Sequence, residues 1–159
     1  MELFTGNEEF ADGVSLAYAM EDGLQQFYST LADEAALDEL KNLYQRLANF
    51  EVKHKARLAE EYQARMKGGA SQKLFEIISS GVMEGGRNIA DFLRQVQGDL
   101  NNMTDVLELA MMLETQALDL YSRMAQKSSV GSTRDLFLSL ADEEKMHLGF
   151  LAEEMDNIL

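Results

Sequence analysis

Apolar residues recur along four stretches of the chain at spacings of three and four positions, which is the period of an amphipathic helix. The four stripes are Leu16, Met20, Leu24, Phe27 and Leu31; Leu40, Leu43, Leu47, Phe50 and Leu58; Leu107, Met111, Leu118 and Met124; and Leu136, Leu140, Leu148 and Leu151. We therefore expect four long helices, over about residues 8–34, 38–67, 104–127 and 132–158. The chain contains no proline, which agrees with helices that run without a break.

The links between these helices differ in length. The links near residues 35–37 and 128–131 are short, and short links join antiparallel neighbours in helical bundles. We expect one helical hairpin over about residues 8–67, with Thr5 and Glu8 as its capping box, and a second over about residues 104–158.

A long crossover separates the two hairpins, over about residues 68–103. It opens with Gly68-Gly69, a pair that ends a helix readily, and we expect short helices near residues 73–79 and 88–97. A connection of this length allows the second and third long helices to run parallel. The predicted fold class is all-α, a four-helix bundle with a long crossover and an internal two-fold repeat of a helical hairpin.

The second hairpin repeats the first. Glu144 stands 93 positions after Glu51, and His147 stands 93 positions after His54. Further matches at the same shift are Glu21 with Glu114, Tyr28 with Tyr121, and Leu58-Ala59-Glu60-Glu61 with Leu151-Ala152-Glu153-Glu154. Acidic helical segments often resemble one another, but agreement of Glu, Tyr, Glu and His in one register indicates a duplication.

Both histidines of the chain follow a glutamate by three positions, in Glu51/His54 and Glu144/His147. Residues three apart share one face of a helix, so each motif directs a carboxylate and an imidazole to one point. With Glu21 and Glu114 from the other two helices, the sequence predicts six ligands for two metal ions. Four carboxylates balance two divalent cations, and carboxylate with imidazole favours iron or manganese over a structural zinc site.

Within this predicted centre, Glu51 and Glu144 are expected to bridge the two metals. Glu21 with His54, and Glu114 with His147, then complete each one. The alternative is that a buried histidine is an ordinary core residue and that Glu21 lies at a solvated helix edge.

Tyr28 and Tyr121 are the candidate catalytic residues. Their hydroxyls are expected to hydrogen-bond ligating carboxylates, and the rings can be oxidised in one-electron steps. The alternative is that both are ordinary aromatic residues of the core.

Composition narrows the classes of function. A chain of 159 residues suits one domain, which we expect to span residues 1–159. The net charge of −14 disfavours binding to nucleic acid or to an anionic membrane. No apolar stretch reaches membrane-spanning length, and the N-terminus lacks the features of a signal peptide, so we expect a cytoplasmic protein. The absence of cysteine excludes disulfides and thiolate metal sites within this sequence.

With these residues in hand, the chain resembles the ferritin-like superfamily, and within it the rubrerythrin-like branch. The resemblance covers the whole chain and is carried by Glu21, Glu51-x-x-His54, Glu114 and Glu144-x-x-His147. It implies a four-helix bundle with a di-iron site. Rubrerythrins reduce hydrogen peroxide, whereas ferritins and bacterioferritins oxidise and store iron.

The chain departs from these relatives in ways that shape the expectation. Rubrerythrins usually carry a rubredoxin domain with four cysteines, so here we expect a separate electron-donor protein such as a rubredoxin. Their additional glutamate on the third helix is replaced by Ala117, and the methionine that binds haem in bacterioferritins is replaced by Val52, so no haem is expected. The chain ends 12 residues after His147, without the fifth helix of cage-forming ferritins, and we expect a homodimer.

The resemblance leaves three functions open. The first is a non-haem di-iron oxidoreductase that reduces hydrogen peroxide or dioxygen with electrons from a separate donor, as in defence against oxidative stress. The second is a ferroxidase that stores or handles iron. The third is a helical binding module that its metals only stabilise. The expected cofactors are two iron ions, with manganese or zinc as substitutes.

Overall fold

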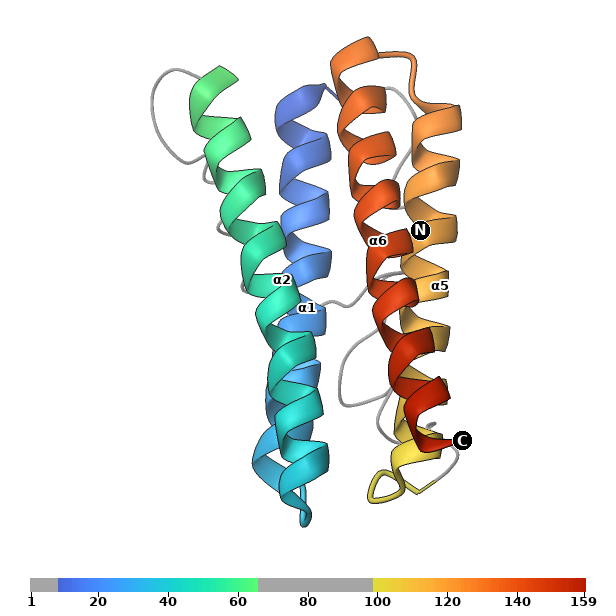
Figure 1. Cartoon of the computed structure of the whole chain (residues 1–159). Helices are drawn as coiled ribbons and strands as arrows, with labels where there is room; N and C mark the ends of the chain where they lie inside the picture. Colours follow the sequence, from blue (N-terminus) through green and yellow to red (C-terminus); the bar gives the residue numbers. More distant parts are fainter. Residues whose placement is uncertain (1–8, 66–98) are drawn as a thin grey trace. The chain divides into compact units, whose positions relative to one another are not determined.

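The computed structural model describes residues 9–65 and 99–159, and over these residues the chain forms long α-helices (Figure 1). They are α1 (Phe10–Glu34), α2 (Asp38–Arg65), α5 (Met103–Lys127) and α6 (Gly131–Ile158). No strand occurs in the described ranges. The all-α class expected from the sequence is confirmed. The starts of the described helices, and the ends of α1, α5 and α6, lie within two residues of their expected positions.

Some expectations fall on other residues. The capping box of Thr5 and Glu8, the Gly68-Gly69 helix end and the short helices near 73–79 and 88–97 lie outside the described residues. The predicted single domain over residues 1–159 stays a prediction.

The helices fall into two compact units, one that holds α1 and α2 and one that holds α5 and α6. Within each unit the two helices lie side by side over most of their length, as an antiparallel hairpin (Figure 1). We call these units the first and second hairpin. Their links are short, as the sequence predicted, and in the second hairpin Arg134 closes the link by donating to the carbonyl of Ser128 at 3.0 Å.

The apolar stripes form the buried faces of the helices. On α1 all five predicted residues are buried, and on α2 Leu40, Leu43, Leu47 and Leu58 are buried. Burial of such side chains supplies the main driving force for packing the helices together. The hairpins are therefore built on the leucine positions that the periodicity identified.

Four predicted core residues are only half-buried: Phe50, Met111, Leu118 and Leu148. The centre of the inward face of α2 runs through Leu47, Glu51, His54 and Leu58, which leaves Phe50 at its edge. The predicted stripe followed apolar residues alone, and it therefore missed the inward face of α2, part of which is polar.

The start of α5 is set by a side chain that the sequence analysis overlooked. The carboxamide oxygen of Asn102 accepts a hydrogen bond from the backbone N–H of Asp105 at 3.2 Å. This N-cap satisfies a donor that the first turn leaves without a helical partner. The helix therefore begins at Met103, one residue before the expected start.

None of the described helices combines the length and the apolar character needed to cross a bilayer.

The stripe account predicts a large effect of truncating Leu47, which is completely buried. We expect Leu47→Ala to lower the free energy of unfolding by about 2–5 kcal/mol, because it leaves a cavity between packed helices. The matched control is Met146→Ala at a side chain that is 67% exposed, expected to change stability by less than about 0.5 kcal/mol. Urea unfolding followed by circular dichroism measures both, and equal effects would contradict the assigned faces.

Candidate metal centre

In the first hairpin, two glutamates and a histidine converge in the core. Glu21 lies on α1, and Glu51 and His54 lie on α2; none of them exceeds 5% exposure. Nδ1 of His54 lies 3.0 Å from Oε2 of Glu21 and 3.5 Å from Oε2 of Glu51. One ligand atom from each of the three lies within 4.8 Å of the others. We call these three residues the first triad.

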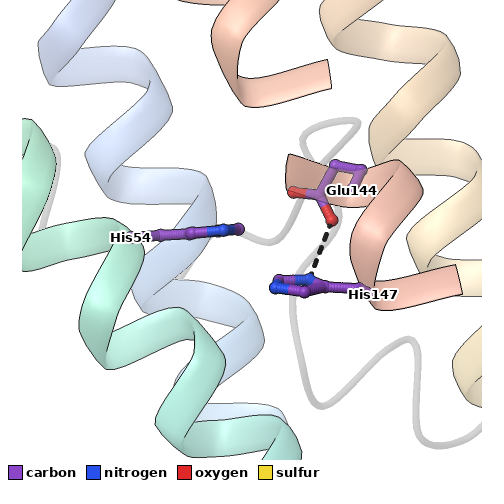
Figure 2. Close-up of side chains that lie close together, drawn as sticks. All are labelled: His54, Glu144 and His147. Carbon is purple, nitrogen blue, oxygen red and sulfur yellow. Dashed lines mark ion pairs between the residues drawn. The ribbon is translucent and has the colours of Figure 1, made fainter. Parts of the chain in front are cut away.

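The second hairpin builds the equivalent arrangement from Glu114 on α5 and from Glu144 and His147 on α6. Both carboxylates are fully buried and His147 is 7% exposed. Nδ1 of His147 lies 3.0 Å from Oε2 of Glu114 and 3.3 Å from Oε2 of Glu144. Figure 2 shows the Glu144–His147 ion pair as a dashed line, and also His54 projecting from α2. We call these residues the second triad.

Local geometry explains both triads. Glu and His three positions apart on one helix lie on the same face, and the antiparallel neighbour presents its own glutamate at the same level. The six residues predicted from the sequence are thus all buried, and the structure brings them together three by three within each hairpin. A single centre made by both triads stays a prediction.

The donor set of each triad fits a metal ion. Burying carboxylates is costly unless they are paired or bound to a cation. In each triad two carboxylates face the same imidazole Nδ1, and the single proton of that nitrogen serves two acceptors poorly, whereas a cation attracts all three groups. Oxygen and imidazole ligands with positions left open match iron or manganese.

The two candidate tyrosines are core residues. Tyr28 is 1% exposed, and its ring and the Phe27 ring form a T-shaped pair with a centroid distance of 5.5 Å. Tyr121 is fully buried and stacks on Phe137 at 6.0 Å. Each lies two turns along the helix from a triad glutamate, on the same face. The predicted hydrogen bonds from their hydroxyls to the ligating carboxylates stay predictions.

Tyr44 is a buried polar residue that the sequence analysis missed. It is 1% exposed on α2, and burial raises the pKa of its hydroxyl to about 12, so the group remains neutral at physiological pH. Its position lies on the Leu40–Leu47 stripe, which was the available signal. The repeat did not highlight Tyr44, because the equivalent residue of the second hairpin is Phe137.

The structure also shows the two positions, Ala117 and Val52, at which the chain differs from the rubrerythrin and bacterioferritin ligand patterns. Ala117 is fully buried on α5, one turn after Glu114, and its methyl group cannot ligate a metal. Val52, next to Glu51, is 43% exposed. Neither position adds a donor to the triads.

Residues 12–155 match the Rubrerythrin family. The chain belongs to the rubrerythrin family. That membership confirms the resemblance and the ferritin-like fold class, and it supports a di-iron carboxylate protein.

A solved structure of a hypothetical protein from Pyrococcus furiosus is similar to the chain. It has 22% sequence identity and a TM-score of 0.56, and the match covers 93% of this chain and 89% of that one. At this identity the likeness shows the fold alone. No curated protein sequence matches the chain.

If each triad holds one metal, anaerobic titration with Fe(II) saturates at two ions per chain. We expect His54→Ala and His147→Ala each to weaken binding at one site by at least roughly 100-fold, since loss of a ligand exceeds the effect of losing a supporting residue. Helix content should change little in both, because the core is made by the leucine stripes and alanine favours helix.

The matched controls are Lys53→Ala and Met146→Ala, which alter the exposed neighbours of the two histidines. Calorimetry and metal analysis provide the measurement, with circular dichroism for the fold. A plateau at one ion or none in the wild type, or two normal sites in both histidine variants, would contradict the assignment.

Proposed function

We propose that the chain is a non-haem di-iron oxidoreductase that reduces hydrogen peroxide with electrons from a separate donor. The observation that carries this proposal is the pair of matching buried Glu/Glu/His triads in a chain of the rubrerythrin family. Resemblance to rubrerythrins supplies the substrate class.

In this proposal the six triad residues are the ligands, with Glu51 and Glu144 as bridges. Two iron ions bound there would pass electrons from the donor to the peroxide, in the reaction H₂O₂ + 2 e⁻ + 2 H⁺ → 2 H₂O. The four carboxylates supply the negative charge that two divalent cations require. Each imidazole presents Nδ1 to its triad. With a metal bound at Nδ1, the proton of the neutral ring would reside on Nε2.

The surroundings of the triads serve this chemistry in two ways. Apolar side chains one helical turn from the triad glutamates, such as Leu24 and Leu47, are fully buried and would limit the water that reaches the ligands. Tyr28 and Tyr121 are the proposed hydrogen-bond donors to the ligating carboxylates, which would hold each carboxylate in one orientation.

The donor and the assembly belong to the same proposal. None of the 159 residues is cysteine, so we propose a separate rubredoxin-type protein as the source of electrons. We further propose a homodimer that works in the cytoplasm.

A second function has a specific observation in its favour. The two triads have the same composition, and Ala117 lies where rubrerythrins carry an additional glutamate. A symmetric six-ligand centre resembles the ferroxidase centres of iron-handling proteins. In that alternative Fe(II) is the substrate, and its oxidation is the reaction.

Steady-state turnover separates these functions. With iron-loaded protein and a reductant, we expect kcat/KM for hydrogen peroxide to exceed that for dioxygen by roughly tenfold or more, about 1.4 kcal/mol in the barrier. His54→Ala should lose this turnover and Lys53→Ala should keep it. Faster reaction with dioxygen would favour the ferroxidase, and metal binding without turnover by either oxidant would favour the metal-stabilised binding module.

Storage makes a different physical demand, because a mineral needs an enclosed volume. We expect light scattering to show a small oligomer of dimer size, and aerobic iron loading to stop near the two metals of the proposed centre. The measurement is particle mass and retained iron per chain after gel filtration. A cage-sized particle that keeps many irons per chain would replace the proposed enzyme with an iron store.

A further inference from the structure

A polar cluster lies beside the first triad and joins α1 to α2. Nζ of Lys55, on α2, donates to Oδ1 of Asp22 at 2.5 Å and to Oε1 of Gln25 at 2.8 Å, both on α1. The same ammonium lies 5.2 Å from the centroid of the Tyr18 ring. We call Tyr18, Asp22, Gln25 and Lys55 the Lys55 cluster. Gln26 also donates to it, to Oδ2 of Asp22 at 2.6 Å.

The cluster is partly shielded from water. The side chains of Lys55 and Asp22 are 16% and 12% exposed. A shielded pair with further hydrogen bonds and a cation–π contact holds its geometry better than an exposed pair, which contributes little. The cluster therefore restricts sliding and rotation of α1 against α2 at this level.

The Lys55 cluster lies at the same level along α1 and α2 as the residues of the first triad. Asp22 follows Glu21 directly on α1, and Lys55 follows His54 directly on α2. The Lys55–Asp22 contact thus crosses between the same two helices one residue from the His54–Glu21 contact. Fixing the helices here fixes the backbone positions from which the ligands of the first triad project.

The second hairpin cannot form this cluster. The residues 93 positions after Tyr18, Asp22, Gln25 and Lys55 are Met111, Thr115, Leu118 and Leu148. Three of these are apolar, and the hydroxyl of Thr115 donates to the carbonyl of Met111 on its own helix at 2.7 Å. The duplicated hairpins therefore have the same ligands but different supports.

We propose that the Lys55 cluster makes the two metal sites unequal: it preorganises the first triad, which binds its metal more tightly and fills first. Lys55 is then a positioning residue. The inference rests on that part of the proposed function in which each triad holds a metal. Lys55 and Asp22 cancel in charge, so the effect on the triad is geometric. The expected difference between the sites is roughly tenfold, the lower end of the range for residues that support metal ligands.

The test is an anaerobic titration with Co(II), followed by calorimetry and by the visible absorption of the bound ion. The wild type should bind two ions in separate steps. His54→Ala should remove the tight step, and His147→Ala should remove the weak one. This assignment uses no oxidant, so it does not depend on peroxide turnover.

The decisive variant copies the second hairpin into the first, as Asp22→Thr with Lys55→Leu. It leaves the net charge unchanged, and we expect the tight step to weaken roughly tenfold until the two steps merge, while the weak step stays in place. Lys55→Arg, which keeps the cation, should keep both steps. The control is Asp142→Asn with Lys145→Gln, a charge-neutral change at an α6 ion pair whose side chains are 73% and 63% exposed.

Any of the following results would overturn the proposal: indistinguishable sites in the wild type, a tight step that survives His54→Ala, or equal weakening of both sites in the double variant. Two equal sites would leave the proposed function standing, whereas absence of metal binding would overturn both. If the double variant does not fold, the assignment by the two histidine variants still decides which triad fills first.

Discussion

The burial of two carboxylates against one imidazole in each hairpin is the constraint on which the rest of the structure depends. A helix face that carries glutamates into a core must give them a partner there, because the loss of hydration is large. Each hairpin meets this demand by directing a histidine Nδ1 at both carboxylates, across 3.0 Å to one of them. A divalent cation would satisfy the same groups more fully, and this is the physical basis of the metal assignment.

Burial of the leucine stripes supplies stability that offsets the cost of burying the carboxylates of the triads. Fully buried residues such as Leu24, Leu47 and Leu107 hold the helices of each hairpin together whether or not the triads hold a metal. We infer that the triads determine the chemistry, whereas the leucine stripes determine the fold. This division explains why one hairpin design can appear twice in a chain, with the triad residues retained and many other core positions changed.

The sequence predicted the parts of the molecule that both hairpins share. Helical periodicity placed the four helices, and the spacing of Glu51 with His54 and of Glu144 with His147 identified the triads. The same periodicity wrongly placed Phe50 and Leu148 in the core. A stripe that follows only apolar residues departs from an inward face that contains Glu and His. It also missed the Asn102 cap, which depends on the backbone geometry of one turn.

What differs between the hairpins was hidden for a related reason. A repeat highlights residues that recur, so it did not highlight Tyr44 and Lys55, whose counterparts are Phe137 and Leu148. The contact between Lys55 and Asp22 spans 33 positions of sequence and depends on how α1 and α2 pack. Only the structure shows that register.

Anomalous X-ray diffraction from iron-loaded crystals tests the central claim, that each triad holds one metal ion. The account predicts two iron peaks per chain, one bound to Nδ1 of His54 and the carboxylates of the first triad, the other bound to Nδ1 of His147 and the carboxylates of the second. A single peak, or iron bound away from both histidines, would contradict it.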